Sequence, residues 1–138
     1  YEDCTTDCKF LVQRFEMLAG IGTHIDAPAH CFPKTKTIND LSIEMLISPC
    51  IVIDVSQEND EKYCVGIESI KNFERTYGKT WKNSFVIFYT GWDQFWTQPE
   101  KYRNNYNFPS LSKEVAEYLI SENIAGIGID TLSPDRPE

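Results

Sequence analysis

Cys50-Ile51-Val52-Ile53-Asp54-Val55 is a nearly continuous apolar run with the length of a strand. Such a run is typical of a strand that is buried on both faces, as the strands of parallel sheets are. Residues 85–89 form a second β-rich apolar run, and residues 124–129 form a third that contains two glycines. We therefore predict three buried strands from residue 50 onward.

The segments between these strands have the periodicity of helices. Residues 67–77 place four apolar side chains on one helical face: Ile67, Ile70, Phe73 and Tyr77. Gly78 follows where a helix end is expected. Ser112 is a good N-cap for a second helix that runs through Asn123. The apolar face of that helix is formed by Val115, Ala116, Leu119 and Ile120. Strands that alternate with helices predict an α/β layer arrangement.

The first third of the chain is less regular. Residues 10–17 are rich in apolar and aromatic side chains and predict a strand, and a loop dense in Gly and Pro follows over residues 19–33. Residues 37–47 predict a short helix with Asp40 or Ser42 as its cap. No repeat, low-complexity tract or long linker interrupts the sequence, so residues 1–138 are expected to form a single domain.

Composition narrows the classes of function. The chain has 138 residues, 41% hydrophobic and 25% charged, which are ordinary values for a globular protein with a core. A net charge of -8 disfavours nucleic acid and anionic membranes as partners. No apolar run approaches the roughly 20 residues needed to cross a bilayer. We therefore expect the partner of this protein to be a small molecule.

The cysteines favour a reduced, cytoplasmic protein. Their number is odd and none form a C-x-x-C pair: Cys4, Cys8, Cys31, Cys50 and Cys64. Cys50 and Cys64 flank or enter apolar segments and are predicted to be small core residues. Cys31 adjoins His30, but no independent Cys/His pair accompanies it, so we do not expect it to be a nucleophile.

Both histidines of the chain stand in the Gly/Pro-rich loop. In an extended segment His24 and Asp26 point to the same side, and an imidazole with a carboxylate on one face can bind Zn²⁺ or Mn²⁺. Pro28 stiffens the loop and can turn His30 back towards the same point. The alternative is a hydrogen-bonded surface loop that happens to hold both histidines, because an H-x-D spacing alone is a weak signal.

Six residues of this loop match a family signature: Gly22, Thr23, His24, Asp26, Pro28 and His30. The stretch resembles the signature His-x-Gly-Thr-His-x-Asp-x-Pro-x-His of the cyclase family of metal-dependent hydrolases. That family includes kynurenine formamidase and isatin hydrolase. Three later stretches are also similar to the family: residues 51–55, residues 90–92 and residues 126–135. The resemblance covers essentially the whole chain.

The resemblance implies a swivelling β/β/α domain with a mixed sheet and flanking helices. It implies hydrolysis of an amide, an N-formyl or cyclic amide on an aromatic substrate, as an arylformamidase of tryptophan catabolism performs it. His24 and Asp26 would hold Zn or Mn, and His30 would act as general base and then as acid to the leaving nitrogen. Family members are commonly homodimers.

The chain departs from the family pattern at three places. The first His of the signature, a metal ligand in typical members, is Gly20 here. Family members also have a strand upstream of Tyr1 and a further His and Glu downstream of Glu138. The resemblance therefore implies that N- and C-terminal segments are lacking and that the 138-residue segment alone is inactive.

Further candidates follow two of the predicted strands. Trp92, Phe95 and Trp96 are predicted to line an aromatic substrate pocket, with core packing as the alternative. Three residues are predicted to orient the metal ligands by hydrogen bonding to them: Thr23, Asp130 and Ser133. Asp130 would equally cap a turn. Two other functions stay open: a small-molecule-binding protein without catalysis, because Gly20 removes a ligand, and an ester or lactone hydrolase.

Overall fold

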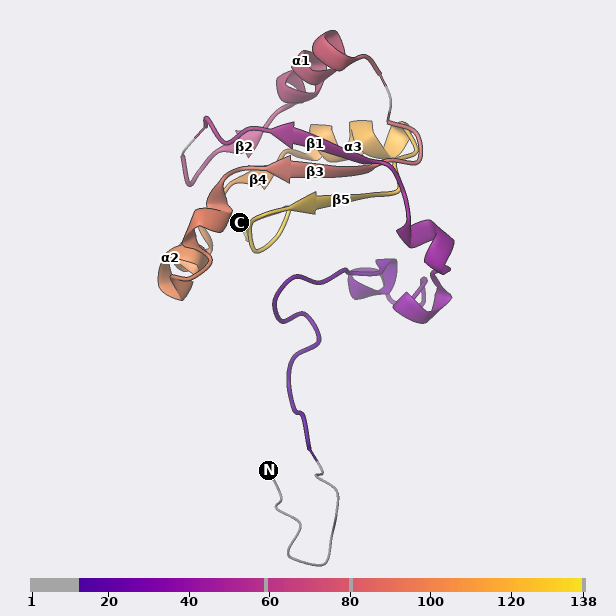
Figure 1. Cartoon of the computed structure of the whole chain (residues 1–138), viewed down its shortest axis with the longest axis vertical. Helices are drawn as coiled ribbons and strands as arrows, with labels where there is room; N and C mark the ends of the chain where they lie inside the picture. The colour runs from indigo at the N-terminus through magenta and orange to yellow at the C-terminus, as the bar shows by residue number, and fades with distance from the viewer. Residues whose placement is uncertain (1–12, 59, 80, 138) are drawn as a thin grey trace, which may run out of the picture. The chain divides into compact units, whose positions relative to one another are not determined.

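The computed structural model describes residues 13–58, 60–79 and 81–137 (Figure 1). By its contacts the chain splits into two compact units, Tyr1–Ser42 and Ile43–Glu138, which we describe separately. The second unit contains all the described strands and α-helices. Within the described residues no helix is long and apolar enough to cross a membrane.

The second unit is an α/β fold, as predicted. Its main sheet has the order β1-β3-β5, formed by β1 (Cys50–Asp54), β3 (Phe85–Tyr89) and β5 (Gly126–Ile129). A smaller sheet pairs β2 (Cys64–Val65) with β4 (Ser110–Leu111). Every strand pair in the described residues is parallel, so the predicted mixed sheet is not found there. Parallel neighbours need crossover connections, which contain the helices here.

The two longer helices follow the sequence prediction closely. α1 (Ile67–Tyr77) has the predicted bounds, and Gly78 ends it with a φ of 83° while its N–H donates to the Glu74 carbonyl. α3 (Lys113–Ser121) begins after Ser112, whose hydroxyl accepts the Val115 N–H. α3 ends two residues earlier than predicted, because Asn123 adopts a left-handed conformation.

A third helix and two short turns were not predicted. α2 (Pro99–Arg103) begins at a proline, which is favourable at the first helical position. The 3-10 turn η4 (Trp92–Phe95) precedes it and η5 (Asn104–Tyr106) follows it. These elements lie in the Trp-rich segment between β3 and β4.

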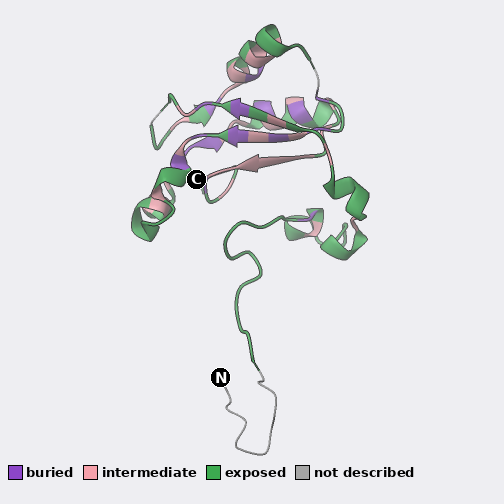
Figure 2. Cartoon of the chain, in the orientation of Figure 1, coloured by how far each residue is buried: buried purple, intermediate pink, exposed green. Residues whose placement is uncertain are grey.

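The core lies on one face of the main sheet (Figure 2). Register pairs Ile51 with Val86 and Ile53 with Phe88, so these side chains share a face. α1 and α3 cover this face, and the core contains residues from both helices, both sheets and the loop before β3: Ile53, Val55, Val65, Ile70, Trp81, Val86, Phe88, Val115 and Leu119.

The opposite face of the main sheet is more open than predicted. Val52 is 53% exposed and Cys50 is exposed, so β1 is not buried on both faces. Cys64 is exposed as well, and the prediction that both cysteines are core residues is wrong. The helices cover one face only, and alternate residues of a strand point to the other.

The predicted apolar faces of the two helices are buried near the middle of each helix but exposed in its last turn. Ile70, Val115 and Leu119 are fully buried, whereas Tyr77 is 70% and Ile120 is 71% exposed. Each of the two exposed residues lies in the last turn of its helix. The sheet is short, so the ends of the helices extend beyond the surface that they pack on.

On the open face of the main sheet, the ring of Phe85 fills the space beside two glycines of β5, Gly126 and Gly128. A Cβ added to Gly126 would lie 2.8 Å from the Phe85 ring, and one added to Gly128 would lie 3.0 Å from it. Phe85 is the register partner of Gly126 on the neighbouring strand. The ring of Phe85 therefore covers the part of β5 that has no side chains.

The first third of the chain contains only short 3-10 turns in its described part: η1 (Pro28–His30), η2 (Ile38–Asp40) and η3 (Ile43–Leu46). The strand predicted over residues 10–17 lies partly outside the described residues, and residues 13–17 are not a strand. The single helix predicted over residues 37–47 is wrong. Asp40 is not its cap, because its carboxylate accepts the N–H and hydroxyl of Thr37 in a capping box.

Candidate functional site

His24 is held by its own loop. Its Nδ1 lies 2.8 Å from the carbonyl oxygen of Gly22. A carbonyl only accepts hydrogen bonds, so Nδ1 is the donor here, and in a neutral ring Nε2 would have the lone pair. This is the arrangement of a histidine that ligates through Nε2, because metal-bound imidazoles usually donate the other N–H to a carbonyl or carboxylate.

Asp26 stands between the two histidines. Its Oδ2 lies 3.6 Å from Nε2 of His24, and its Oδ1 lies 3.5 Å from Nδ1 of His30. The backbone explains the second contact, because η1 begins at Pro28 and the His30 N–H donates to the Ala27 carbonyl. The turn brings His30 back towards Asp26. The loop therefore brings together the three residues that the sequence predicted.

The pair His24–Asp26 fits two ligands of one divalent ion. Two tetrahedral ligands at about 2.1 Å from zinc lie about 3.4 Å apart, close to the observed 3.6 Å. A neutral imidazole and a carboxylate are suitable donors for zinc and manganese. In residues 13–58, 60–79 and 81–137 no group of three or more His, Cys, Asp and Glu side chains is placed to hold an ion. The donor set fits a metal but is incomplete within those residues.

Asp130 lies at the carboxyl end of β5 and holds the turn that follows β3. Its Oδ1 accepts the Thr90 N–H at 2.9 Å and the Thr90 hydroxyl at 2.7 Å, and its Oδ2 lies 3.4 Å from the Asp93 N–H. The observed contacts of Asp130 are therefore those of a residue that fixes a neighbouring turn. Whether it also supports metal ligands stays a prediction.

The three aromatic candidates differ in exposure. Trp92 is buried, and its indole N–H donates to the Tyr102 carbonyl at 2.9 Å. Phe95 is half-buried and packs edge-on against Trp92 at 5.0 Å, while Trp96 is 54% exposed. Trp92 thus packs the interior of its segment, and only Phe95 and Trp96 retain surface that a ligand could contact.

A small acidic rim surrounds the carboxyl ends of the main strands. The carboxylate of Asp93, together with burial and with Asp130 and Asp54, raises the pKa of the Tyr89 phenol. The hydroxyl and N–H of Ser56 donate to Asp54 and lower the pKa of that carboxyl group. Ligand sites of α/β sheets gather at this end of the strands, so the rim is a second candidate surface.

The remaining predicted residues have ordinary surroundings. Thr23 is exposed in the turn next to His24. The Ser133 hydroxyl donates to Asp135 at 2.6 Å, and the Ser133 carbonyl accepts the Thr131 hydroxyl at 2.9 Å. These contacts stabilise the turn after β5. A ligand-orienting role for Thr23 and Ser133 stays a prediction.

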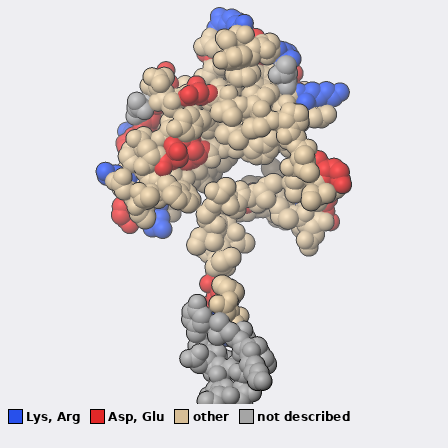
Figure 3. Space-filling model, viewed as in Figure 1, with Lys and Arg blue, Asp and Glu red and all other residues tan. Residues whose placement is uncertain are grey.

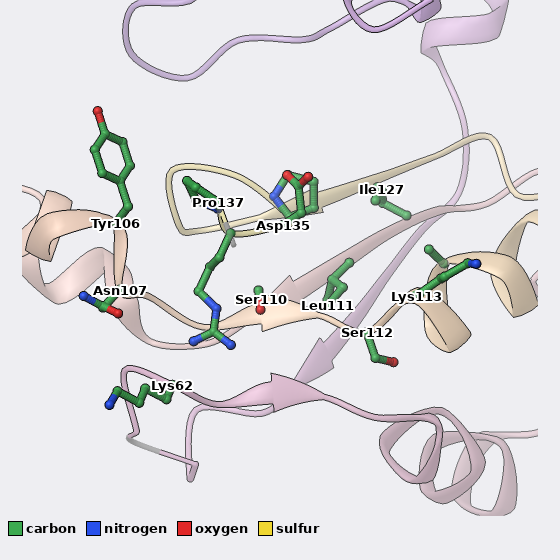
Figure 4. A pocket seen from close by; sticks show the side chains of 13 residues that line it. Lys62, Tyr106, Asn107, Ser110, Leu111, Ser112, Lys113, Ile127, Asp135 and Pro137 are labelled. Carbon is green, nitrogen blue, oxygen red and sulfur yellow. The ribbon is translucent and has the colours of Figure 1, made fainter.

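A cavity of the second unit has a volume of about 820 Å³ and lies between β4, the start of α3 and the segment after β5 (Figure 4). Lys62 and Lys113 lie at opposite sides of it, and Arg136 also lines it. The Arg136 guanidinium donates to the Glu61 carbonyl at 3.3 Å. Because the three cations do not converge, the cavity is not a built anion site. A smaller cavity of about 460 Å³ is bordered by Ser133.

Basic side chains are scattered on the face that Figure 3 draws. In this view the Lys and Arg side chains stand apart from one another and do not form one patch. The expectation of no nucleic-acid or membrane partner, drawn from the net charge of -8, stays a prediction.

Sequence reasoning missed two residues of the Asp130 region. Thr90 follows β3, which neighbours β5 in the sheet, so its closeness to Asp130 could have been predicted from parallel pairing. The Tyr102 hydroxyl donates to the Asp130 carbonyl at 2.9 Å. No sequence signal pointed to Tyr102, which comes from the unpredicted helix α2.

Comparison with known proteins places these features in one family. Residues 2–136 match the family described as "Putative cyclase". Isatin hydrolase of Roseibium aggregatum is 30% identical over 125 residues, which are 83% of this chain and 47% of that protein. Kynurenine formamidase of Geobacillus thermodenitrificans is 33% identical over 125 residues, which are 90% of this chain and 53% of that protein.

A solved structure shares the fold. An isatin hydrolase bound to the product analogue thioisatinate superposes with a TM-score of 0.81 at 27% identity, over 95% of this chain and 54% of that one. The α/β fold is thus shared with that solved structure. The chain belongs to the putative cyclase family. It spans about half the length of the curated relatives that it matches.

Proposed function

We propose that this protein is a metal-dependent hydrolase that cleaves an amide bond, either an N-formyl amide or a cyclic amide on an aromatic substrate. One observation carries the proposal: the Asp26 carboxylate lies between the imidazoles of His24 and His30, and Nδ1 of His24, not Nε2, is bonded to the Gly22 carbonyl. Relatives named kynurenine formamidase and isatin hydrolase support the choice of an amide substrate.

His24 and Asp26 are the proposed metal ligands, and the metal is Zn or Mn. Their 3.6 Å separation and their donor chemistry support this assignment. A divalent ion bound there would polarise the scissile carbonyl and lower the pKa of water towards about 7. The Asp26 carboxylate would also offset part of the positive charge of that ion.

His30 is the proposed proton-transfer residue. Its side chain is 66% exposed, so its ring is accessible to water and substrate. Asp26 lies 3.5 Å from Nδ1 of His30 and can orient the ring and stabilise its protonated form. In the proposed reaction His30 takes a proton from the attacking water and then gives it to the leaving nitrogen.

The aromatic segment is the proposed substrate-binding part. Trp96 is 54% exposed and Phe95 is half-buried, which leaves ring surface for an aromatic group. Trp92 supports this segment from within, and Asp130 fixes the turn that leads into it. Thr23 and Ser133 are assigned supporting roles beside their turns.

A second candidate function is a small-molecule-binding protein without catalysis. The observation that favours it is that no group of three His, Cys, Asp or Glu side chains in the described residues is placed to hold an ion, together with Gly20 in place of the first signature histidine. Hydrolysis of an ester or lactone is a variant of the first candidate, because the same groups would serve a different leaving atom.

The function is tested with His30→Ala in the intact protein. Metal content is measured together with turnover of an N-formyl aryl amine, a cyclic aryl amide and an aryl ester. We expect the variant to retain its metal and to lose about 10² to 10⁴-fold in rate. Loss of metal together with activity would assign His30 as a ligand. Wild-type protein without metal and without turnover would support the binding function instead.

A further inference from the structure

Tyr102 of α2 contacts both the end of the main sheet and the aromatic segment. Its hydroxyl donates to the Asp130 carbonyl at 2.9 Å, and its own carbonyl accepts the Trp92 indole N–H at 2.9 Å. Its ring packs against the Trp96 ring, with 5.4 Å between the ring centroids and 85° between the planes. One half-buried residue therefore connects the end of β5, the turn η4 and the exposed tryptophan.

Asp130 holds Trp96 by two routes. Its carboxylate lies 3.4 Å from the Asp93 N–H, and the Asp93 carbonyl accepts the Trp96 N–H at 2.9 Å, so this route places the backbone. Its carbonyl accepts the Tyr102 hydroxyl, and the Tyr102 ring contacts the Trp96 ring, so this route places the side chain. Removal of the Tyr102 hydroxyl would break the second route and leave the first intact.

The Tyr102 phenol is suited to remain a donor. Burial, together with the charges of Asp130 and Asp93, raises the pKa of this phenol, so it keeps its proton well above neutral pH. A hydrogen bond to a backbone carbonyl restricts the orientation of the Tyr102 ring, and an edge-to-face contact has a preferred geometry. The Trp96 ring is consequently held in place although Trp96 is 54% exposed.

An exposed tryptophan that is already held suits one kind of ligand. Immobilising a free side chain opposes binding, and here contacts within the protein restrict the ring beforehand. A planar aromatic group can stack on such a ring or meet it edge-on, whereas a puckered aliphatic ring of similar size gains neither interaction. The surface of Trp96 therefore favours planar aromatic ligands.

We propose that Tyr102 is a positioning residue that sets a preference for planar aromatic substrates, because its hydroxyl holds the Trp96 ring in the orientation that the substrate ring contacts. The inference rests on the proposed function, in which Trp96 binds the substrate. It adds a specific effect, since the Tyr102 hydroxyl acts on aromatic recognition and not on the chemical step.

The test uses the intact protein and a matched pair of neutral probes, benzamide with its planar ring and cyclohexanecarboxamide with its puckered ring. Calorimetry gives the Kd of each probe, and turnover of formanilide gives KM and kcat. Tyr102→Phe removes the hydroxyl and keeps the ring. Tyr77→Phe makes the same change on α1, at a tyrosine that is 70% exposed, and is the control. Trp96→Leu and the double variant Tyr102→Phe/Trp96→Leu complete the set.

We expect Tyr102→Phe to raise the Kd of benzamide and the KM of formanilide by about threefold to tenfold, the effect of one lost neutral hydrogen bond, with kcat unchanged. The Kd of cyclohexanecarboxamide should stay at the wild-type value, and Tyr77→Phe should change nothing. Trp96→Leu should abolish the preference for benzamide, and the double variant should bind as Trp96→Leu does, because the two residues act as a unit. Circular dichroism checks that every variant is folded.

Three results would overturn the inference while leaving the proposed function intact. One is a Tyr102→Phe variant with unchanged affinity for benzamide. Another is an equal loss of affinity for both probes, which would give the hydroxyl a structural role alone. The third is a full additional loss in the double variant, which would mean that Tyr102 does not act through Trp96.

The proposed function fails in a different way. Wild-type protein that binds benzamide in a Tyr102-dependent manner but hydrolyses no formanilide would support the inference and count against the hydrolase. Wild-type protein that neither binds benzamide nor hydrolyses formanilide would refute both.

Discussion

Asp26 shares its two carboxylate oxygens between two imidazoles, one to each side. Asp26→Asn keeps the shape but removes the charge and one of the acceptor oxygens. We expect this variant to lose most of its bound metal, because an amide is a poor ligand for Zn²⁺ or Mn²⁺. Metal content after dialysis, measured by mass spectrometry, checks the outcome.

A matched control is available in the same unit. Asp40 is another exposed carboxylate, but its hydrogen bonds come from the N–H and hydroxyl of Thr37. Asp40→Asn should retain the wild-type metal content. If Asp26→Asn also retains it, Asp26 is not a ligand.

Asp130 has a different role, which is mechanical. Its carboxylate accepts both donors of Thr90, which is buried. We expect Asp130→Ala to lower the free energy of unfolding by about 1 to 3 kcal/mol, because the Thr90 donors lose their partner. The fluorescence of Trp92 should shift as the turn loosens. Glu58→Ala, at an exposed carboxylate, should change stability by no more than about 0.5 kcal/mol.

At the scale of elements, one carboxylate joins the two covering helices. Glu74 of α1 accepts hydrogen bonds from the Tyr118 hydroxyl of α3, the Trp81 indole and the Lys71 ammonium. The Glu74 side chain is only 14% exposed. We expect Glu74→Gln to lower the free energy of unfolding at neutral pH by about 1 to 3 kcal/mol, measured by urea denaturation.

The effect of Glu74 should depend on pH. Burial opposes its ionisation, but the hydrogen bonds from Tyr118, Trp81 and Lys71 outweigh burial, so the pKa lies below its ordinary value of 4.5. A lowered pKa stabilises the fold above that value and ceases to do so as the pH falls through the native pKa. The difference between wild type and Glu74→Gln should therefore shrink in acid.

Glu117→Gln is the control for this prediction. Glu117 lies on α3, is 65% exposed and pairs with Lys113 at 3.5 Å. An exposed pair of this kind contributes little, so the variant should unfold like the wild type at every pH. An equal effect of the two substitutions would mean that Glu74 does not connect the helices.

The elements that sequence predicted well are those with a local pattern. α1 repeats apolar residues at helical spacing and ends at Gly78, and β3 is an unbroken apolar run. The failures have a tertiary cause. Val52 and Ile120 belong to apolar patterns but are exposed, because burial depends on which face a neighbouring element covers.

The candidate site also has a part that local sequence predicts and a part that only tertiary structure determines. His24, Asp26 and His30 are close in the sequence, so spacing and one proline-started turn suffice to bring them together. Thr90 and Tyr102 meet Asp130 across 40 and 28 residues respectively. Only sheet pairing and the fold of the α2 segment determine that meeting, and no local pattern contains it.

At the scale of the whole molecule, the first third of the chain exposes many large apolar side chains: Phe15, Met17, Leu18, Ile21, Ile25, Phe32, Ile38, Ile43, Met45, Leu46 and Ile47. Apolar surface of this extent usually marks an interaction site. We expect the intact protein to be a homodimer that buries part of this surface. Light scattering after size-exclusion chromatography should give twice the chain mass, and a monomer at micromolar concentration would contradict the expectation.

Because the Phe85 ring lies over Gly126 and Gly128, substitutions at these three positions depend on one another. A side chain at position 126 would collide with the ring at 2.8 Å, so it can be accepted only after position 85 has become smaller. A smaller residue at position 85 first would in turn leave two bare glycines uncovered. Neither change is neutral without the other, and the order of substitutions in any lineage is therefore constrained. We therefore expect related sequences to have either an aromatic residue at position 85 with glycines at 126 and 128, or a smaller residue at position 85 with side chains at those two positions.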